Sequence, residues 1–276
     1  MHDSLQLQST LRPVQGFSFQ GTYVWSKALE VSSTSYTNPA EREKEYGLGA
    51  TDVRHDFRGN GTFNLPIGPN KLLFGKSSGW VARAIEGWQS SFIINLSSGL
   101  PSSIGATYTV GTTTYPTGLY ANSVADVVGP FSLSKGNVEW NGDHGSYFGS
   151  QFAQIADPQC ASVAADLKQY CTLQAVTDAK TGQIVLQNPQ PGKRGTLGRQ
   201  TMSRPGQWSF DSAMGKTVRI TESKSLQIRL DATNILNHPL PNDPSLIINS
   251  TANPFGSIQD KGTQHRQFKG QIRFSF

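Results

Sequence analysis

The chain ends in the stretch HRQFKGQIRFSF, from His265 to Phe276, which is the most informative part of the sequence. Phe268, Ile272 and Phe274 share one parity with the terminal Phe276, and the opposite parity carries Gln267, Lys269, Gln271, Arg273 and Ser275. Because successive side chains of a strand point to opposite faces, this spacing predicts a strand with one apolar and one polar face.

The same alternation recurs at least six more times along the chain. In one example Trp88, Phe92 and Leu96 alternate with polar residues. We therefore expect seven strands, near residues 3–12, 16–28, 50–66, 82–98, 205–219, 223–237 and 264–276. Strands of this kind suit either a soluble sandwich, which buries its apolar side chains in a core, or a membrane barrel, which turns them to lipid.

The lengths of the connections favour a membrane barrel. Short connections at 13–16 and 220–223 and an intermediate one at 67–80 alternate with long ones at 29–50, 99–204 and 237–263. Outer-membrane barrels have short periplasmic turns and long extracellular loops. The sequence thus predicts an all-β, antiparallel transmembrane barrel segment, an open curved sheet in isolation, with a large extracellular loop at 99–204 and a periplasmic C-terminus.

Composition agrees with many strands and turns. The 276 residues are 36% hydrophobic and include 28 Gly and 15 Pro. No run approaches the roughly 20 apolar residues of a membrane helix. The formal net charge is +5, but the basic residues stand singly rather than in a stripe with stacking aromatic residues, so we expect no nucleic-acid partner.

The N-terminal residues and the strand number suggest a piece of a longer protein. Residues 1–11 have neither a basic region nor an apolar run, so they predict no secretory signal. Single-chain bacterial barrels are closed and have an even number of strands, whereas seven is odd. We therefore expect further barrel strands on the N-terminal side of this chain.

Several stretches together give a family resemblance. They are TYVWSKALE at 22–30, YGLGATDVRHDFRGNGTFNLPIG at 46–68, IEGWQSSFIINLSSGLP at 85–101, GTLGRQTMSRPGQWSFDSAMGKTVRITESKSLQIRLDATNILNHP at 195–239 and the terminal QIRFSF. In order and spacing they resemble TonB-dependent outer-membrane receptors, most of all the Oar-like type with a carboxypeptidase-regulatory domain that is abundant in Acidobacteria. The resemblance covers most of the chain apart from the middle of the 99–204 loop.

The resemblance implies a barrel of about 22 strands. It also implies an N-terminal plug, absent from this sequence, and energised nutrient uptake through the TonB complex. The expected partners are outer-membrane lipid, the plug and remaining strands of the same protein, and the barrel assembly machinery. In this family the terminal aromatic residues, here Phe274 and Phe276, are part of the assembly signal. No cofactor is implied, and the location is the outer membrane of a Gram-negative cell.

Charged residues on the polar parity are expected to face the lumen. They are Arg54, Asp56, Arg58, Asp211, Arg229, Asp231, Lys269 and Arg273. His55 stands between Asp52 and Asp56 in sequence, which could suggest acid–base chemistry, but alternation turns it to the other face. A ladder of ion pairs is the favoured interpretation.

Nothing in the sequence supports an enzyme or a metal site. His144, His238 and His265 are scattered without metal-ligand spacing, and no Ser-His-Asp or Cys-His arrangement has a supporting context. Because loops carry recognition, the candidate ligand contacts are loop aromatic and charged residues. They are Tyr115, Tyr120, Trp140, Asp143, His144 and Tyr147.

Cys160 and Cys171 lie close together in the longest loop, which on this topology faces the oxidising exterior. We expect them to form a disulfide, worth on the order of 3 kcal/mol if unstrained.

Two other functions stay open at this point. A structural or adhesive barrel would bind surfaces without energised uptake. A soluble β-sandwich binding module would bury its aromatic residues in mid-core, whereas a membrane barrel would place them in interfacial girdles.

Overall fold

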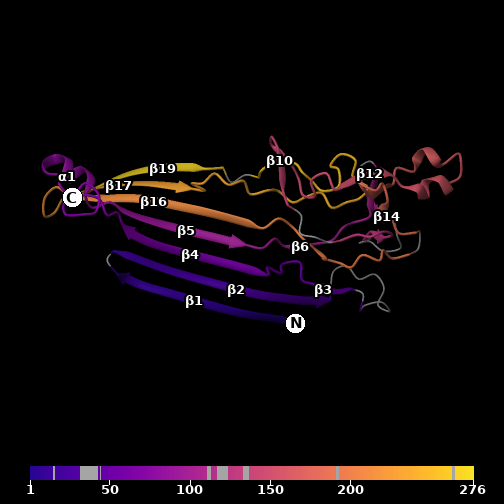
Figure 1. Ribbon diagram of the computed structural model, residues 1–276, viewed down its shortest axis with the longest axis horizontal. Coiled ribbons are helices and arrows are strands. Elements are labelled where there is room, and N and C mark those ends of the chain that lie inside the picture. The colour runs from indigo at the N-terminus through magenta and orange to yellow at the C-terminus, as the bar shows by residue number, and fades with distance from the viewer. Residues whose placement is uncertain are drawn as a thin grey trace.

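The computed structural model describes residues 1–14, 16–31, 43, 45–110, 113–116, 124–132, 137–190, 193–262 and 265–276; of 14, 108–110 and 113–116 it describes the backbone alone. Long strands occupy the left and centre of Figure 1, and shorter elements gather at the right. We call these shorter elements, built from the connections 99–204 and 237–263, the loop layer.

One antiparallel sheet forms the wall of the molecule, in the order β1-β2-β4-β5-β16-β17-β19, with β3 paired to the outer end of β2. Its strands are β1 (His2–Val14), β2 (Phe17–Val31), β3 (Tyr46–Leu48), β4 (His55–Asn64), β5 (Gln89–Ser97), β16 (Gln207–Arg219), β17 (Ser225–Thr233) and β19 (Gln267–Ser275). The seven long strands follow one another as a meander, which confirms the predicted all-β antiparallel fold. No helix among the described residues is long and apolar enough to cross a membrane.

The register places the apolar residues of neighbouring strands side by side. One row across the sheet runs Leu7, Tyr23, Phe57, Leu96, Trp208. No described element covers most of this face, and on β19 its side chains are among the most exposed in the chain. A soluble sandwich would bury these residues, so the exposed apolar face favours a wall that lies in lipid.

At Gly61, strand β4 carries glycine where both neighbouring strands carry an aromatic ring. A Cβ on Gly61 would lie 2.6 Å from the ring of Phe92, and one on Gly59 would lie 3.3 Å from the ring of Phe19. The rings of Phe19 and Phe92 are 6.3 Å apart, and Phe92 is 6.3 Å from Phe210. The two glycines therefore leave the space in which aromatic rings from both neighbouring strands pack over β4.

The loop layer has a hydrophobic core of its own. Ile104, Leu186, Ile248 and Ile258 are fully buried there. Its strands are β6 (Pro101–Ser102), β7 (Thr107–Val110), β8 (Thr113–Pro116), β9 (Asp126–Val127), β10 (Glu139–Asn141), β11 (His144–Ser146), β12 (Phe152–Ala156), β13 (Gln174–Asp178), β14 (Ile184–Gln187), β15 (Met202–Ser203) and β18 (Ser257–Ile258), with the 3-10 helices η2 (Pro158–Ser162) and η3 (Lys168–Tyr170). The long connections are thus a packed unit on one end of the sheet.

A buried polar network joins distant parts of this layer. The Asp157 carboxylate accepts hydrogen bonds from the Gln187 side chain at 2.8 Å and from the Asn188 side chain at 2.8 Å. The Asn249 side-chain amide donates to the Asn188 side-chain oxygen at 2.7 Å and to the Thr107 carbonyl at 3.1 Å. Because buried polar groups are costly when unpaired, this network fixes how the connections pack.

The strand expected at 82–98 is shorter than predicted. Residues Gly79–Ile85 form a helix, α1, and β5 begins only at Gln89. Gly87 has a φ of 74°, which interrupts any extended strand across it. The strand expected at 223–237 likewise ends at Thr233, because Asn234 and Asn237 adopt positive φ values of 47° and 51°. The strand expected at 50–66 begins at His55.

Replacing Gly61 by Ala tests the close packing over β4. The new Cβ would lie 2.5 Å from the Ser18 carbonyl oxygen as well as against Phe92. We expect the free energy of unfolding in detergent micelles, measured by urea titration, to fall by about 1–3 kcal/mol. The matched control is Gly270→Ala on β19, where a Cβ meets open space. Equal stabilities of the two variants would contradict the packing described here.

Candidate functional site

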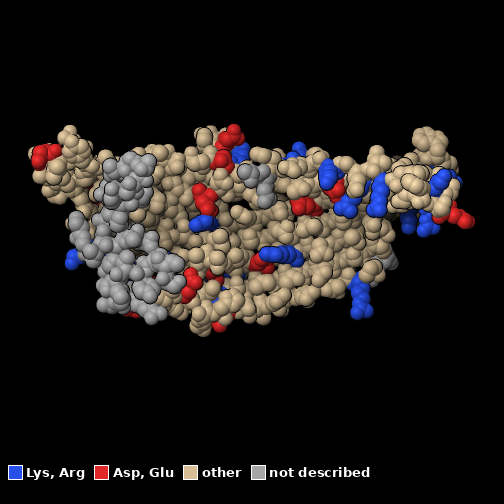
Figure 2. Space-filling view, turned by 180° about the vertical axis from the view of Figure 1, so that it is seen from behind, with Lys and Arg blue, Asp and Glu red and all other residues tan. Residues whose placement is uncertain are grey.

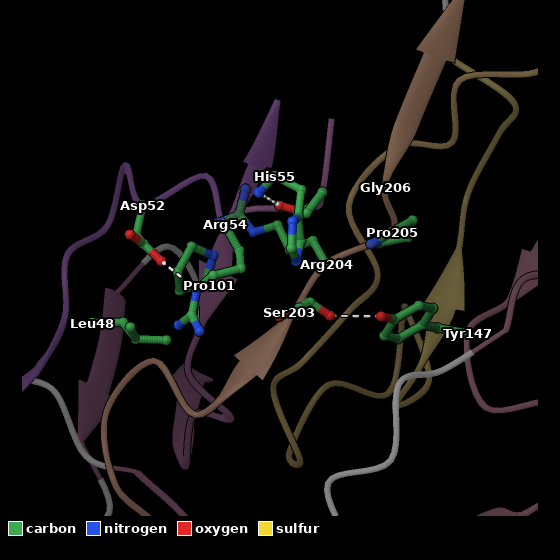
Figure 3. Close-up of a pocket in the computed structure, with 12 residues that line it drawn as sticks. Leu48, Asp52, Arg54, His55, Pro101, Tyr147, Ser203, Arg204, Pro205 and Gly206 are labelled. Carbon is green, nitrogen blue, oxygen red and sulfur yellow. Dashed lines mark hydrogen bonds and ion pairs between the residues drawn. The ribbon is translucent and has the colours of Figure 1, made fainter. Parts of the chain in front are cut away.

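A cavity of about 440 Å³ lies where the outer end of the sheet meets the loop layer (Figure 3). One wall comes from the segment leading into β4 and the start of that strand, and includes Asp52, Arg54 and His55. The opposite wall comes from β15 and the residues before β16, among them Arg204. The cavity is thus bordered by two arginines from distant parts of the chain.

Asp52 and Arg54 form the buried part of this site. The Asp52 carboxylate accepts a hydrogen bond from the Ala28 amide at 2.6 Å, and it lies 3.9 Å from Nε of Arg54. Its side chain is only 2% exposed. Nε of Arg54 is buried and makes no hydrogen bond with any described residue. Such a donor normally binds a water molecule or a ligand.

On the other wall Arg204 forms an ion pair with Asp243, which lies in the 237–263 connection. The neighbouring Ser203 carbonyl accepts a hydrogen bond from the Tyr147 hydroxyl at 2.6 Å (Figure 3). These contacts tie β15 to two other parts of the loop layer. Ser203 and Arg204 were missed by the sequence prediction, because they stand in a short connection before β16 with no pattern that marks a site.

The comparisons with known proteins now bear on the whole fold. The model of a family described as outer membrane beta barrel domain matches residues 1–269. The chain belongs to this family. No match was found among curated proteins or among solved structures. In an outer-membrane barrel the apolar face of the sheet lies against lipid and the polar face borders the interior.

Two ion pairs, each between residues two positions apart in the sequence, lie on the polar face of this barrel wall. Arg58 contacts Asp56 at 3.0 Å, and Arg229 contacts Asp231 at 2.8 Å. Figure 2 shows acidic and basic side chains beside one another over the middle of the sheet. Uncharged surface separates one such pair from the next. These are the two-residue ion pairs that the alternation of charges predicts.

The remaining charges of that face differ in their surroundings. Asp211 accepts a hydrogen bond from the Asn234 amide at 2.7 Å, so it caps the turn after β17. Lys269 and Arg273 are exposed on β19, and neither forms an ion pair with a described residue. Phe274 and Phe276 are exposed at the opposite end of the sheet from the loop layer.

His55 points to the apolar face, as alternation predicts. Its Nδ1 is hydrogen-bonded to the Tyr23 hydroxyl at 2.7 Å. Nearby on the same face the ring of Trp208 stacks on His238 with 3.9 Å between centroids. Trp208, Tyr23 and His55 line a second, almost wholly apolar cavity of about 400 Å³ at the outer end of the sheet. Such amphipathic rings are typical of the interfacial girdle of a barrel.

The loop residues predicted to contact a ligand lie in different environments. Tyr120 lies outside the described residues, and so does the side chain of Tyr115. Asp143 and His144 are exposed in the β10–β11 turn, where His144 Nδ1 is hydrogen-bonded to the Gln259 carbonyl at 2.7 Å.

Trp140 and Tyr147 both contact the core of the loop layer. Trp140 packs against it from outside, and the ammonium group of Lys261 lies 5.6 Å from the Trp140 ring centroid. Tyr147 is 2% exposed. Its ring is part of the core, and its hydroxyl donates to the Ser203 carbonyl at the edge of the cavity, so the ligand contact expected of Tyr147 would lie inside the cavity and stays a prediction.

Cys160 and Cys171 form a disulfide in the loop layer. It joins η2 to the residue that follows η3. Among the described residues no group of three or more His, Cys, Asp or Glu side chains is placed to hold a metal ion.

Replacing Asp52 by Ala tests how the cavity is built. The change removes the acceptor for the Ala28 amide and the nearest counter-charge of Arg54. We expect the free energy of unfolding to fall by about 1–3 kcal/mol. It is measured in micelles by unfolding the protein with urea and following its tryptophan fluorescence. Asp143→Ala, at an exposed turn, is the control and should stay within about 0.5 kcal/mol of the native protein. If Asp52→Ala leaves the free energy of unfolding unchanged, a structural role for the carboxylate is ruled out.

Burial lowers the pKa of His238 from its ordinary value of 6.5. The unfolded chain therefore binds more protons than the folded one below that pH, and stability falls as the pH drops through about 6.5. Replacing His238 by Phe retains a ring over Trp208 but removes the titration. We expect urea midpoints measured from pH 8 to pH 5 to fall less in His238→Phe than in the native protein. Identical pH profiles would contradict this assignment.

Proposed function

We propose that the chain forms part of the wall and the outer loops of a TonB-dependent outer-membrane receptor, which binds an extracellular nutrient and admits it to the periplasm. The observation that carries the proposal is the asymmetry of the two ends of the sheet. One end has tight turns between β1 and β2 and between β16 and β17, and the other carries the packed loop layer. The loop layer would then be extracellular, and the C-terminus periplasmic.

The directions of the edge strands support a wall that is completed by other strands. Neighbours in the seven-strand meander are antiparallel, so β1 and β19 run in the same direction. Neither edge can face lipid with its backbone groups unpaired. Antiparallel closure therefore takes an odd number of further strands. Identical copies of this chain, arranged around an axis normal to the membrane, would place β19 of one copy beside β1 of the next. Those two strands would be parallel, which disfavours a barrel closed by copies of this chain.

Unbalanced charge on the polar face supports a plug inside the barrel. Lys269 and Arg273 lack an ion-pair partner among the described residues, and the guanidinium of Arg58 is widely exposed beside its carboxylate. A plug domain with acidic side chains would supply partners for these cations. This chain would then contribute wall and loops, with no catalysed reaction, while the energised movement belongs to the plug.

The cavity at the base of the loop layer is the proposed ligand contact closest to the wall. It has a buried donor, Nε of Arg54, that makes no hydrogen bond with any described residue, and a second arginine on the facing wall. Trp140, Asp143 and His144 would meet the ligand earlier, at the outer surface. A ligand that enters from outside would reach the cavity after passing these side chains.

Uptake by cells that express the complete receptor tests the proposal. The probes are a radiolabelled ferric siderophore, an oligosaccharide and a peptide, each offered to cells with and without the energising inner-membrane complex. We expect one probe to accumulate only when the complex is present. Accumulation that persists without the complex would overturn the proposal in favour of a passive channel, and no accumulation of any probe would favour a structural or adhesive barrel.

The same assay tests the cavity. Replacing Arg204 by Met removes one of its two cations and should lower accumulation of the transported probe several-fold. Lys180→Met, at an exposed turn of the loop layer, should leave uptake unchanged. Equal uptake by the two variants would exclude Arg204 from ligand binding.

A further inference from the structure

The connection between β4 and β5 exposes an unusual amount of apolar surface. Leu72 is 85% exposed, Phe74 69% and Trp80 81%, and Leu73 and Val81 are exposed as well. All five lie within ten residues of one another in a segment that includes α1. Exposed apolar residues gathered in this way mark an interaction surface rather than ordinary protein surface. We call residues 71–84 the α1 segment.

Two contacts place α1 on the apolar face of the sheet. The indole nitrogen of Trp88 donates a hydrogen bond to the Ala84 carbonyl at 3.1 Å, and the ammonium group of Lys216 donates one to the Arg83 carbonyl. In β16, Lys216 has the parity of Phe210 and Met214, so its side chain leaves the sheet on the apolar face. The α1 segment is therefore continuous with the face that lies against lipid, at the end with the short turns (Figure 1).

Lys216 fixes the orientation of the helix. Lysine on a lipid-facing parity is costly, and here it is only 7% exposed because α1 covers it. Its ammonium group binds a carbonyl in the last turn of the helix, where the backbone lacks a partner and carries partial negative charge. Ala82 is buried, whereas Trp80 and Val81 on the same helix are exposed.

Basic residues accompany this apolar surface. Lys71, Lys76 and Arg83 are exposed in the segment, and Glu86, just after the helix, is the acidic residue nearest to it. Apolar side chains beside a cluster of Lys and Arg are the features with which an interfacial segment binds an anionic membrane surface: the apolar groups enter the acyl boundary and the cations meet phosphates.

We propose that the α1 segment is an interfacial anchor that binds anionic phospholipid headgroups at the edge of the membrane. The inference rests on the proposed orientation only in assigning the anchor to the periplasmic leaflet. Lipid is the occupant, rather than a periplasmic protein, because the segment extends the same apolar face that the membrane covers and because its charge complements phosphate. The anchor holds one end of β4 and β5 at a fixed depth in the membrane.

Site-specific fluorescence quenching in vesicles tests the anchor. Both cysteines of this chain are paired, so once any cysteine in the rest of the receptor is replaced by serine, a single introduced cysteine can be labelled selectively. The receptor carrying Phe74→Cys with an attached fluorophore is reconstituted in phospholipid vesicles that contain acyl-brominated lipid. We expect strong quenching of this label. The matched control is Ile155→Cys, an exposed apolar position in the loop layer, which should be quenched little. Equal and weak quenching at both positions would overturn the proposal and favour a protein partner.

The charge of the lipid tests the second half of the proposal. Brominated phosphatidylglycerol and brominated phosphatidylcholine are compared at the same mole fraction. We expect the anionic lipid to be enriched around residue 74 by roughly fivefold or more. About fivefold is the preference that a single basic residue near an anionic surface would give. The triple variant Lys71→Gln, Lys76→Gln, Arg83→Gln should lose that preference while keeping the native electrophoretic mobility of the folded barrel. Equal quenching by the two lipids in the native sequence would show an apolar anchor without headgroup binding. It would overturn the proposal that the α1 segment binds anionic headgroups.

Because these vesicles contain no energising complex, the outcome is independent of transport. A receptor that fails to take up any nutrient can still be quenched at residue 74. A receptor that transports normally can still lack the anchor.

Discussion

Backbone hydrogen bonding in lipid is the constraint on which this structure depends. An amide or carbonyl group in hydrocarbon has no water to bind, so each must pair with another strand. Between β1 and β19 the strands meet this requirement through continuous ladders, whereas the outer edges of β1 and β19 need partners from other strands. The same requirement keeps irregular backbone out of the sheet, and the long connections are packed together at one end of it. The division between wall and loop layer follows from this single rule.

The two parts of the molecule use apolar residues in opposite ways. In the loop layer Ile104, Leu186 and Ile248 are buried, so the hydrophobic effect in water holds that layer together. In the wall the apolar residues face outward, and their burial is supplied by lipid. The wall strands are instead held by backbone pairing and by close packing such as that of Phe92 over Gly61. Loss of lipid would therefore remove support from the wall and leave the core of the loop layer in place.

The wall was predictable from the sequence because the side chains of a strand alternate between its two faces. Since one face lies in lipid, apolar residues recur at every second or fourth position, as Phe268, Ile272 and Phe274 do. The loop layer was not predictable in the same way. Its polar network joins Asp157, Asn188 and Asn249, which are far apart in sequence. No local pattern around Tyr147 shows that its ring joins the core or that β15 supplies a carbonyl for its hydroxyl. The last residues of α1, from Ala82 to Ile85, were expected to begin the strand because their apolar side chains run directly into those of β5.

Strand β4 also bears on how the wall is assembled. On its apolar face Gly59 and Gly61 occupy the middle positions, and on its polar face it carries Asp56 and Arg58. By itself the strand offers hydrocarbon only its own rings, Phe57 and Phe63, and the rings of Phe19 on β2 and Phe92 on β5 complete the cover over its centre. Its apolar outer surface is complete only once both neighbours are in place. Entry of this part of the wall into the membrane is therefore a collective step of at least three strands, in which β4 is carried by the strands on either side of it.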